Sequence, residues 1–394
     1  MAELPRYGLP DGDAERRAYA AIVAQSFAGD AEMFEGWVRG FGDGVRVLRD
    51  NELLAGLVIY EMGQFFGGAA IPTWGIAGVG VKPELRARGY AREMMLENLR
   101  ENFESGPAIS TLYPAAPRLY RNLGWEYAGA RCMFAANLSE LPVAETSLEL
   151  REAGPADQHI LEDLYRRRHQ HENGCLDRSD LIWERVRRAP KETPPYSYIA
   201  ERDGEPEGYT IYTQKRQSAK SFRYDLLVRD LVCNTPDALA AMLGLFARHR
   251  SVASRLEFYA APDDPIALEV ARTTELALEQ RMQWMLRIVR VRDALQARGY
   301  SRHVAADAVV HIRDEMLPGN SGDWTLQLAD GRMRVTPGGK GGPTMDIRGL
   351  AALYSSSFAP AQLRAAGLLT GTDRHDAPLA AMFAGTAPWM PDFF

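Results

Sequence analysis

The most informative stretch of this 394-residue chain is Val79-Gly-Val-Lys-Pro-Glu-Leu-Arg-Ala-Arg-Gly-Tyr-Ala-Arg92. An apolar pattern over residues 70–81 predicts a strand, and a helical pattern over residues 84–102 follows a turn that contains Gly89. Glycine lets the backbone approach a ligand, and the first N–H groups of a helix are free donors at the positive end of its dipole. Such a turn binds pyrophosphate, although a glycine-capped strand-to-helix connection has the same pattern.

The sequence around this turn predicts a mixed block of helices and strands. Apolar residues at helical spacing over 13–39 predict two short helices, interrupted at Gly29-Asp30. Strands are expected at 45–49 and 53–60 before the turn, and a strand (108–112), a short helix (116–122) and a last strand (125–134) after it. The order is α-α-β-β-β-α-β-α-β.

Two further segments follow this block. Residues 148–290 repeat its order weakly, with a helix at 157–168, strands at 196–201, 207–215 and 224–232, and a helix up to His249. From about residue 292, strands at 303–313, 324–328 and 333–336, a possible strand at 344–348, and helices between 350 and 383 predict an α+β unit. We therefore expect an α+β protein with three domains, at about 1–140, 141–290 and 291–394.

Composition excludes several classes of protein. Apolar residues make up 46% and charged residues 25%, as in globular proteins, and no apolar run reaches the ~18 residues of a membrane span. The start of the chain lacks a secretory pattern, so we expect a cytoplasmic protein. The net charge of −6 argues against a nucleic-acid partner.

The sequence also argues against a metal centre. Three widely spaced cysteines predict neither a disulfide framework nor a zinc site. His169 and His171 are two residues apart at a predicted helix end, so they face apart, and we expect no metal there. The glycine-rich run 337–344 has the wrong spacing for a phosphate loop.

Two motifs carry a resemblance to a known family. Arg86-x-x-Gly89-x-Ala91 and Tyr120-Arg-Asn-Leu-Gly-Trp-Glu126 resemble the acetyl-coenzyme A (acetyl-CoA) site of the GNAT N-acetyltransferases. With the second, degenerate copy and the end Phe393-Phe394, the chain resembles the enhanced intracellular survival (Eis) family. The resemblance implies two tandem GNAT-like domains, a sterol-carrier-like domain, and a homo-oligomer, which in the family is a hexamer.

The resemblance also implies an acetyl-CoA site in the first domain. The backbone of Val79, Gly80 and Val81 would hold the pantetheine arm. The pyrophosphate would be wrapped by Ala87, Arg88, Gly89, Tyr90, Ala91 and Arg92, and Ala115 and Ala116 would also contact the cofactor. The second copy has neither glycine nor arginine at its turn, so we expect it to be inactive.

The resemblance assigns two catalytic groups. Tyr120 matches the general acid, because a phenol with a pKa near 10 is protonated at neutral pH and can protonate a leaving thiolate. The terminal carboxylate of Phe394 would accept or orient the amine proton. Each residue also has a structural interpretation, Tyr120 as a core aromatic and the tail as a plug.

The implied activity is direct transfer of acetyl from acetyl-CoA to a primary amine on a cationic small molecule, such as an aminoglycoside or polyamine, or on a peptide. An acidic, aromatic-walled acceptor pocket is then expected, with Asp30, Glu32, Glu35 and Asp392 as candidates. A carrier of lipid or another apolar ligand and a protein lysine acetyltransferase are the alternatives.

Overall fold

The protein is an α+β molecule whose first two domains share one sheet. The computed structural model describes residues 5–142, 146–188, 193–218 and 221–394. Within them, thirteen strands form one sheet in the order β1-β2-β3-β4-β5-β13-β6-β12-β11-β10-β9-β7, with β8 paired to β3 outside this path. Five strands form a second sheet in the order β16-β15-β14-β17-β18. None of the helices in these ranges has the length and apolar character that a membrane crossing needs.

The first block contains the predicted elements in the predicted order, preceded by a short strand, β1 (Arg6–Gly8), that was not predicted. The predicted elements are α1 (Gly12–Ser26), α2 (Ala31–Gly40), β2 (Val45–Arg49), β3 (Leu53–Phe66), β4 (Ala69–Val81), α3 (Tyr90–Ser105), β5 (Ile109–Leu112), α4 (Pro117–Arg121) and β6 (Glu126–Asn137). Two boundaries differ from the prediction by six residues. The second strand extends six residues further than Tyr60, to Phe66, and the helix expected from Glu84 begins at Tyr90 after a 3₁₀ turn over Pro83–Leu85.

The second block repeats this arrangement with additions that the sequence pattern did not predict. It contains β7 (Glu149–Glu152), α5 (Gln158–His169), β8 (Leu176–Asp177), α6 (Asp180–Arg187), β9 (Tyr196–Arg202), β10 (Glu205–Arg216), β11 (Tyr224–Cys233), α7 (Pro236–Ala247), β12 (Ala253–Tyr259), α8 (Pro265–Ala271) and β13 (Ala277–Ile288).

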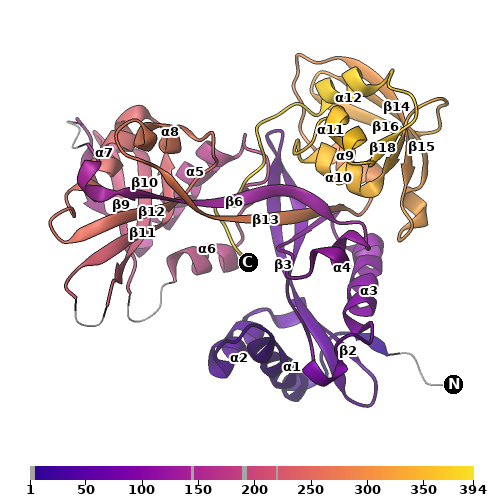
Figure 1. Cartoon of the computed structure of the whole chain (residues 1–394), viewed down its shortest axis with the longest axis horizontal. Helices are drawn as coiled ribbons and strands as arrows, with labels where there is room; N and C mark the ends of the chain where they lie inside the picture. The colour runs from indigo at the N-terminus through magenta and orange to yellow at the C-terminus, as the bar shows by residue number, and fades with distance from the viewer. Residues whose placement is uncertain (1–4, 143–145, 189–192, 219–220) are drawn as a thin grey trace.

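Strand exchange joins the two blocks. β13 lies between β5 and β6 of the first block, antiparallel to both, and β6 pairs with β12 of the second block along its other edge. Figure 1 shows β6 and β13 crossing side by side from one block to the other. The end of β13, from Trp284 to Ile288, is buried, whereas its start is exposed between the blocks. The first sheet is therefore continuous only when both blocks are present.

The third block packs against this shared strand. It contains α9 (Val291–Ala297), β14 (Ala306–Arg313), β15 (Gly322–Ala329), β16 (Arg332–Pro337), β17 (Thr344–Asp346), α10 (Ile347–Tyr354), α11 (Pro360–Ala365), β18 (Leu369–Thr370) and α12 (Asp376–Met382).

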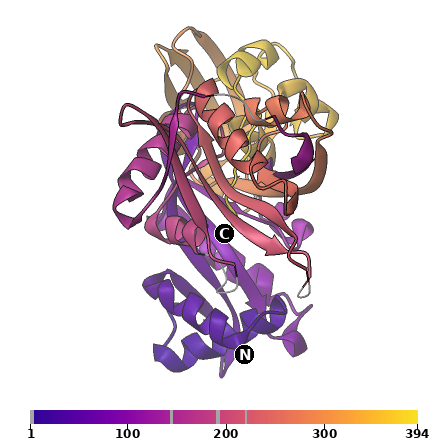
Figure 2. The ribbon, with the colours of Figure 1, turned by 90° about the vertical axis from the view of Figure 1, so that its left-hand side faces the viewer.

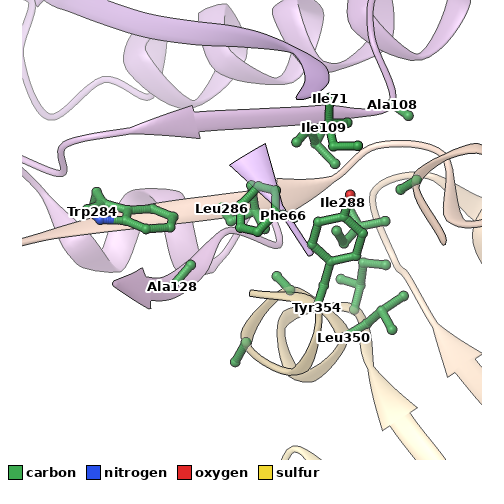
Figure 3. Packing of buried hydrophobic residues seen from close by; sticks show 14 of the residues in the cluster. Phe66, Ile71, Ala108, Ile109, Ala128, Trp284, Leu286, Ile288, Leu350 and Tyr354 are labelled. Carbon is green, nitrogen blue, oxygen red and sulfur yellow. The ribbon is translucent and has the colours of Figure 1, made fainter. Parts of the chain in front are cut away.

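Contacts at the third block are both apolar and ionic. The ring of Tyr354 on α10 lies 5.0 Å from that of Phe66 on β3, in a core that also holds Leu286 of β13 (Figure 3). Arg287 of β13 is fully buried and donates to Asp314 at 2.7 Å. A buried charge needs such a partner, so this ion pair fixes the third block to the shared sheet.

The C-terminal tail then leaves the third block and returns to the centre of the molecule. In both views the C-terminus lies between the first and second blocks, whose residues are far from it in the sequence (Figures 1 and 2). Trp389 forms a bridge with Ala130 of β6, so the tail runs across the shared part of the sheet.

Candidate active site

The site begins with an irregularity in β4. β4 pairs with β5 only from Thr73 to Ile76, so its remaining residues have no β5 partner. Its register against β3 shifts near Gly78, which has φ +62° and accepts a hydrogen bond from the Tyr19 hydroxyl at 2.9 Å. A Cβ on Gly78 would lie 2.7 Å from that hydroxyl, so only glycine fits this bulge. The bulge lies directly before residues 79–81, whose backbone belongs to the end of β4 that pairs with β3 but has no β5 partner.

The predicted phosphate turn follows directly. Ala87 has φ +62° and Gly89, the N-cap of α3, has φ +92° with no side-chain cap. A Cβ on Gly89 would meet no atom within 4 Å, so the space above the turn is open. Arg88 is exposed, whereas Arg86 bonds to Ser26 at 3.1 Å and to the carbonyl of Val81. Arg86 therefore supports the turn, and Arg88 is free to meet a ligand.

The short helix α4 follows β5 in the chain. Ala115 and Ala116 are exposed immediately before it, and Ala116 is its N-cap. Tyr120 on the same helix is buried, with its ring 6.5 Å from that of Trp125. Within the described residues its hydroxyl has no hydrogen-bond partner. Burial raises the pKa of Tyr120 to about 12, so the phenol is protonated at neutral pH.

The C-terminal tail is docked rather than free. Arg131 donates to the carbonyl of Pro391 at 2.7 Å, and Tyr113 donates to the carbonyl of Asp392 at 2.7 Å. The Trp389 indole N–H donates to Glu172 at 2.9 Å. Hydrogen bonds from three parts of the chain therefore fix the path of the last residues.

Phe394 ends within the first block. Its ring lies 5.7 Å from Tyr60 of β3 and 5.5 Å from Tyr113, and a Cβ on Gly75 of β4 would approach it to 3.0 Å. In the described part of the chain, no cationic group lies within ion-pair distance of the terminal carboxylate. The last residue thus reaches the sheet that carries the bulge.

Asp392 has a different role from the one considered in the sequence. It was a candidate for attracting a cationic acceptor, but its carboxylate is buried and bound by Arg178 at 3.0 Å. Arg178 also binds Asp230 at 2.6 Å and lies over the Tyr165 ring. The charge of Asp392 is therefore neutralised inside the protein and anchors the tail.

The other acidic candidates lie on α2 and belong to its own stabilisation. Asp30 caps the helix by accepting from Met33 N at 2.7 Å, and Glu35 pairs with Arg39 at 2.9 Å. Glu32 is exposed on the same helix. The inner face of α2 is aromatic instead, with Trp37 donating to the Tyr60 hydroxyl at 3.1 Å.

One group of side chains has metal-ligand chemistry. His169, Glu172 and Cys175 place one ligand atom each within 4.8 Å of one another. Glu172 is already bound by Arg168, His169 and the Trp389 indole. His171, as expected from its spacing, is exposed while His169 is buried. These hydrogen bonds explain the cluster as an anchor for the tail.

Comparison with known proteins identifies the family. Residues 12–128 and 174–290 each match the acetyltransferase (GNAT) domain, and residues 291–391 match the sterol carrier protein domain. A solved structure of a GCN5-related N-acetyltransferase from Anabaena variabilis is 34% identical, with a TM-score of 0.94 over 99% of this chain and 100% of that one. The chain belongs to the GCN5-related N-acetyltransferases.

Two further relatives define the type of acetyltransferase. A GCN5-related N-acetyltransferase from Kribbella flavida is 31% identical, with a TM-score of 0.86 and 99% of both chains covered. The N-acetyltransferase Eis of Mycobacterium tuberculosis is 27% identical over 84% of both chains. The chain is therefore a GNAT enzyme of the Eis type, with two GNAT domains and a sterol carrier protein domain, and this family implies acetyl-CoA as the acetyl donor.

The first GNAT domain has features that fit this donor. The open space above Gly89, the exposed Arg88 and the unpaired end of β4 are the backbone and charge features that a pyrophosphate and a pantetheine arm need. The equivalent turn of the second GNAT domain differs. Thr235 caps α7 with its own side chain, and Pro236 provides no N–H. A cavity of about 520 Å³ lies at that turn, lined largely by apolar groups, with Arg168 and Arg272 at its wall.

Several site residues carried no recognisable motif in the sequence. Arg131, Arg178 and Tyr113 bind the tail, yet none belongs to a pattern. Asp230 offered one signal, because it interrupts the alternating inward positions Leu226, Val228 and Val232 of a strand. A charge on a buried strand face requires a partner, and Arg178 is that partner.

Proposed function

We propose that this enzyme transfers acetyl from acetyl-CoA directly to a primary amine in its first domain. The observation that carries the proposal is the placement of the chain terminus. Phe394 packs against β3 and β4 near the bulge, and no cation in the described residues neutralises its carboxylate. A free carboxylate and a buried phenol then lie in the same domain as the open phosphate turn.

In this mechanism, Tyr120 and the Phe394 carboxylate handle the protons. The amine nitrogen forms a bond to the acetyl carbon, and the bond between that carbon and the thioester sulfur breaks. The carboxylate accepts or orients the proton that leaves the amine, directly or through water, and Tyr120 gives its proton to the departing thiolate. The raised pKa of Tyr120 supports the donor role, because the phenol stays protonated at neutral pH.

The backbone of residues 79–81 and the turn of residues 87–92 would hold the donor. Gly89 is the most stringent position, since its open Cβ space is where the pyrophosphate would lie. Ala115 and Ala116 can contribute only backbone groups and apolar contact there. We propose that the reaction uses no metal.

We further propose a division of work among the domains at 1–140, 141–290 and 291–394. The first binds the donor, the second does not, and the third supplies the tail. Thr235 and Pro236 support the inactivity of the second domain, because they occupy or remove the amides that would bind phosphate. The acceptor is a cationic small molecule or a peptide amine, and the enzyme forms homo-oligomers, with the hexamer as the expected form.

The test combines binding and activity in the full chain. Calorimetry should find one acetyl-CoA site per chain, and an assay for released coenzyme A over a panel of amines should find turnover. Gly89→Glu should abolish both, because it places bulk and negative charge against the pyrophosphate. Gly89→Ala is the matched control, since it has the same unfavourable φ with a cost of ~1–2 kcal/mol but little bulk. No turnover on any amine, or a second acetyl-CoA site of equal affinity, would refute the proposal.

A further inference from the structure

A small cavity lies beneath the C-terminal tail, on the side of the second domain. Its volume is about 190 Å³, and its floor is formed by residues of β6, β11 and β12. α6 and residues 391–393 form its walls. Its lining includes three arginines, Arg131, Arg185 and Arg229, together with Tyr259 and Phe393.

These three guanidinium groups have no acidic partner. Within the described residues, no carboxylate lies within 4.0 Å of any of them, whereas the ion pairs of the protein involve other arginines, such as Arg16, Arg178 and Arg364. Arg229 donates to the carbonyls of Val186 and Arg185, and Arg131 donates to the carbonyl of Pro391. Each guanidinium has five N–H donors, so most donors at the cavity remain unused.

Other contacts orient the guanidinium groups without neutralising them. Arg131 lies 3.5 Å from the Tyr259 ring centre, and Arg185 lies 5.4 Å from that of Phe393. Burial lowers the pKa of Arg229, and the charges of Arg185 and Arg131 lower it further, while Tyr259 and Asp230 offset part of this decrease. Three cations are thus held together against their mutual repulsion, which an anion between them would relieve.

The one carboxylate in the cavity wall does not provide this compensation. Asp392 is bound by Arg178, which it shares with Asp230, and its side chain is 2% exposed. The terminal carboxylate of Phe394 also lies beyond ion-pair distance of the three arginines. The cavity is therefore positively charged and has room for an anion from outside the chain.

The cavity adjoins the proposed site of acetyl transfer. Phe393 lines it, and the Phe393 ring lies 4.9 Å from Tyr113, whose ring also contacts Phe394 at 5.5 Å. A group bound by the arginines would thus lie beside Phe393, the residue before Phe394, whose carboxylate is the proposed base. A volume of 190 Å³ is below the ~300–1,000 Å³ of a whole-ligand site, so it suits one end of an acceptor.

We propose that Arg131, Arg185 and Arg229 bind an anionic group, a carboxylate or a phosphate, on the acceptor whose amine is acetylated. This proposal rests on the proposed function and, among its acceptors, favours amines that also carry a negative charge, such as a peptide with a free carboxylate, over purely cationic amines. Guanidinium groups bind both anions through paired, charge-assisted hydrogen bonds, so the shared chemistry is an oxyanion. The three arginines bind the anionic end of the acceptor, while the amine at its other end reaches the Phe394 carboxylate.

The experiment uses matched linear amines in the full chain. 6-Aminohexanoate, 5-aminopentyl phosphate, 6-aminohexanamide and hexane-1,6-diamine differ mainly in the group opposite the amine. We expect kcat/KM to be about 10- to 100-fold higher for one or both anionic amines than for the amide, as for a charge-assisted hydrogen bond. Which anion is preferred distinguishes carboxylate from phosphate recognition.

Arg185→Gln is the decisive variant, because the Arg185 side chain makes no hydrogen bond within the described residues and its loss should not affect folding. The substitution should remove most of the preference for anionic amines over the amide, because it raises KM for the anionic amines. KM for acetyl-CoA should stay unchanged. Arg188→Gln is the matched control, an exposed arginine at the end of the same helix. Equal rates on amide and anion, or an unchanged preference in Arg185→Gln, would overturn the proposal while leaving acetyl transfer intact.

A binding measurement separates this proposal from the proposed function. Hexanoate and pentyl phosphate have no amine, so calorimetry with them measures the cavity alone. Binding of either one that is lost in Arg185→Gln but kept in Arg188→Gln would support the anion site even if no amine were acetylated. No binding of either anion to wild-type protein, with no anion preference in turnover, would refute the site.

Discussion

Removing the last residue should nearly eliminate turnover without unfolding the protein. Deletion of Phe394 moves the terminal carboxylate back by ~3.5 Å, one residue of extended chain. Proton transfer needs heavy atoms within ~2.6–3.2 Å, directly or through one water, so the carboxylate at residue 393 would be out of reach. General acid–base catalysis is worth ~100- to 10,000-fold, or about 3–5 kcal/mol in the activation free energy.

Two controls separate the carboxylate from the ring. Phe394→Leu keeps the carboxylate and loses the ring contacts with Tyr60 and Tyr113, each worth ~0.5–1.5 kcal/mol. We expect this variant to lose far less turnover than the deletion. A C-terminal extension replaces the buried carboxylate by an amide and should resemble the deletion, whereas an N-terminal tag should be harmless.

The assay is steady-state release of coenzyme A at saturating acetyl-CoA, with thermal unfolding measured for every variant and tagged form. Anchors upstream of Phe394, including Asp392 on Arg178 and Trp389 on Glu172, should keep the unfolding midpoints close together. If the deletion or the C-terminally extended enzyme keeps turnover within threefold of the N-tagged enzyme, the carboxylate is not the base. The tail would then be a structural plug.

Two other predictions concern Tyr120 and Asp392. Tyr120→Phe should lower turnover ~100- to 10,000-fold, while the Kd for acetyl-CoA stays nearly constant. Wild-type turnover should not decline with rising pH below about pH 10, because the acid is lost only when the Tyr120 phenol, with a pKa of about 12, is deprotonated. Turnover retained in Tyr120→Phe with chemistry rate-limiting would place the acid elsewhere. Asp392→Asn should weaken tail docking by ~1–3 kcal/mol, because Arg178 then keeps only Asp230 as an ion-pair partner. Compared with the exposed control Asp373→Asn, the variant should be digested faster by carboxypeptidase and should have lower turnover. Digestion and turnover equal to those of the control would exclude the anchoring role.

The local elements of the first domain could be predicted because their causes are local. Gly89 and the strand-to-helix change around it depend on neighbouring residues, and β4 and the body of α3 lie where the pattern indicates. The start of α3 was misplaced by six residues because Pro83–Leu85 forms a 3₁₀ turn, which has nearly the same apolar spacing. The family resemblance supplied Tyr120 and Phe394 and, with them, the proton-transfer hypothesis.

The proposed acceptor side could not be predicted, because its residues meet only in the folded chain. Arg131 comes from β6, Arg185 from α6 and Arg229 from β11, and each has an ordinary sequence context. Asp392 was misinterpreted for the same reason. An acidic residue near a docked tail indicates a charged pocket only if no buried arginine neutralises it, and Arg178 lies more than 200 residues away in the sequence.

Strand exchange explains why a second GNAT domain persists without the phosphate turn of the first. β13 fills the place between β5 and β6, and β6 in turn completes the sheet of the second domain through β12. Each domain therefore depends on a strand from the other for its backbone hydrogen bonds, and an unfilled gap would expose two strand edges. The second domain also supplies Arg178, Asp230 and two of the cavity arginines, while β13 carries Arg287 to the third domain. Its strands and charges hold the tail, and under the proposed function they also shape the acceptor side without a donor site in the second domain itself.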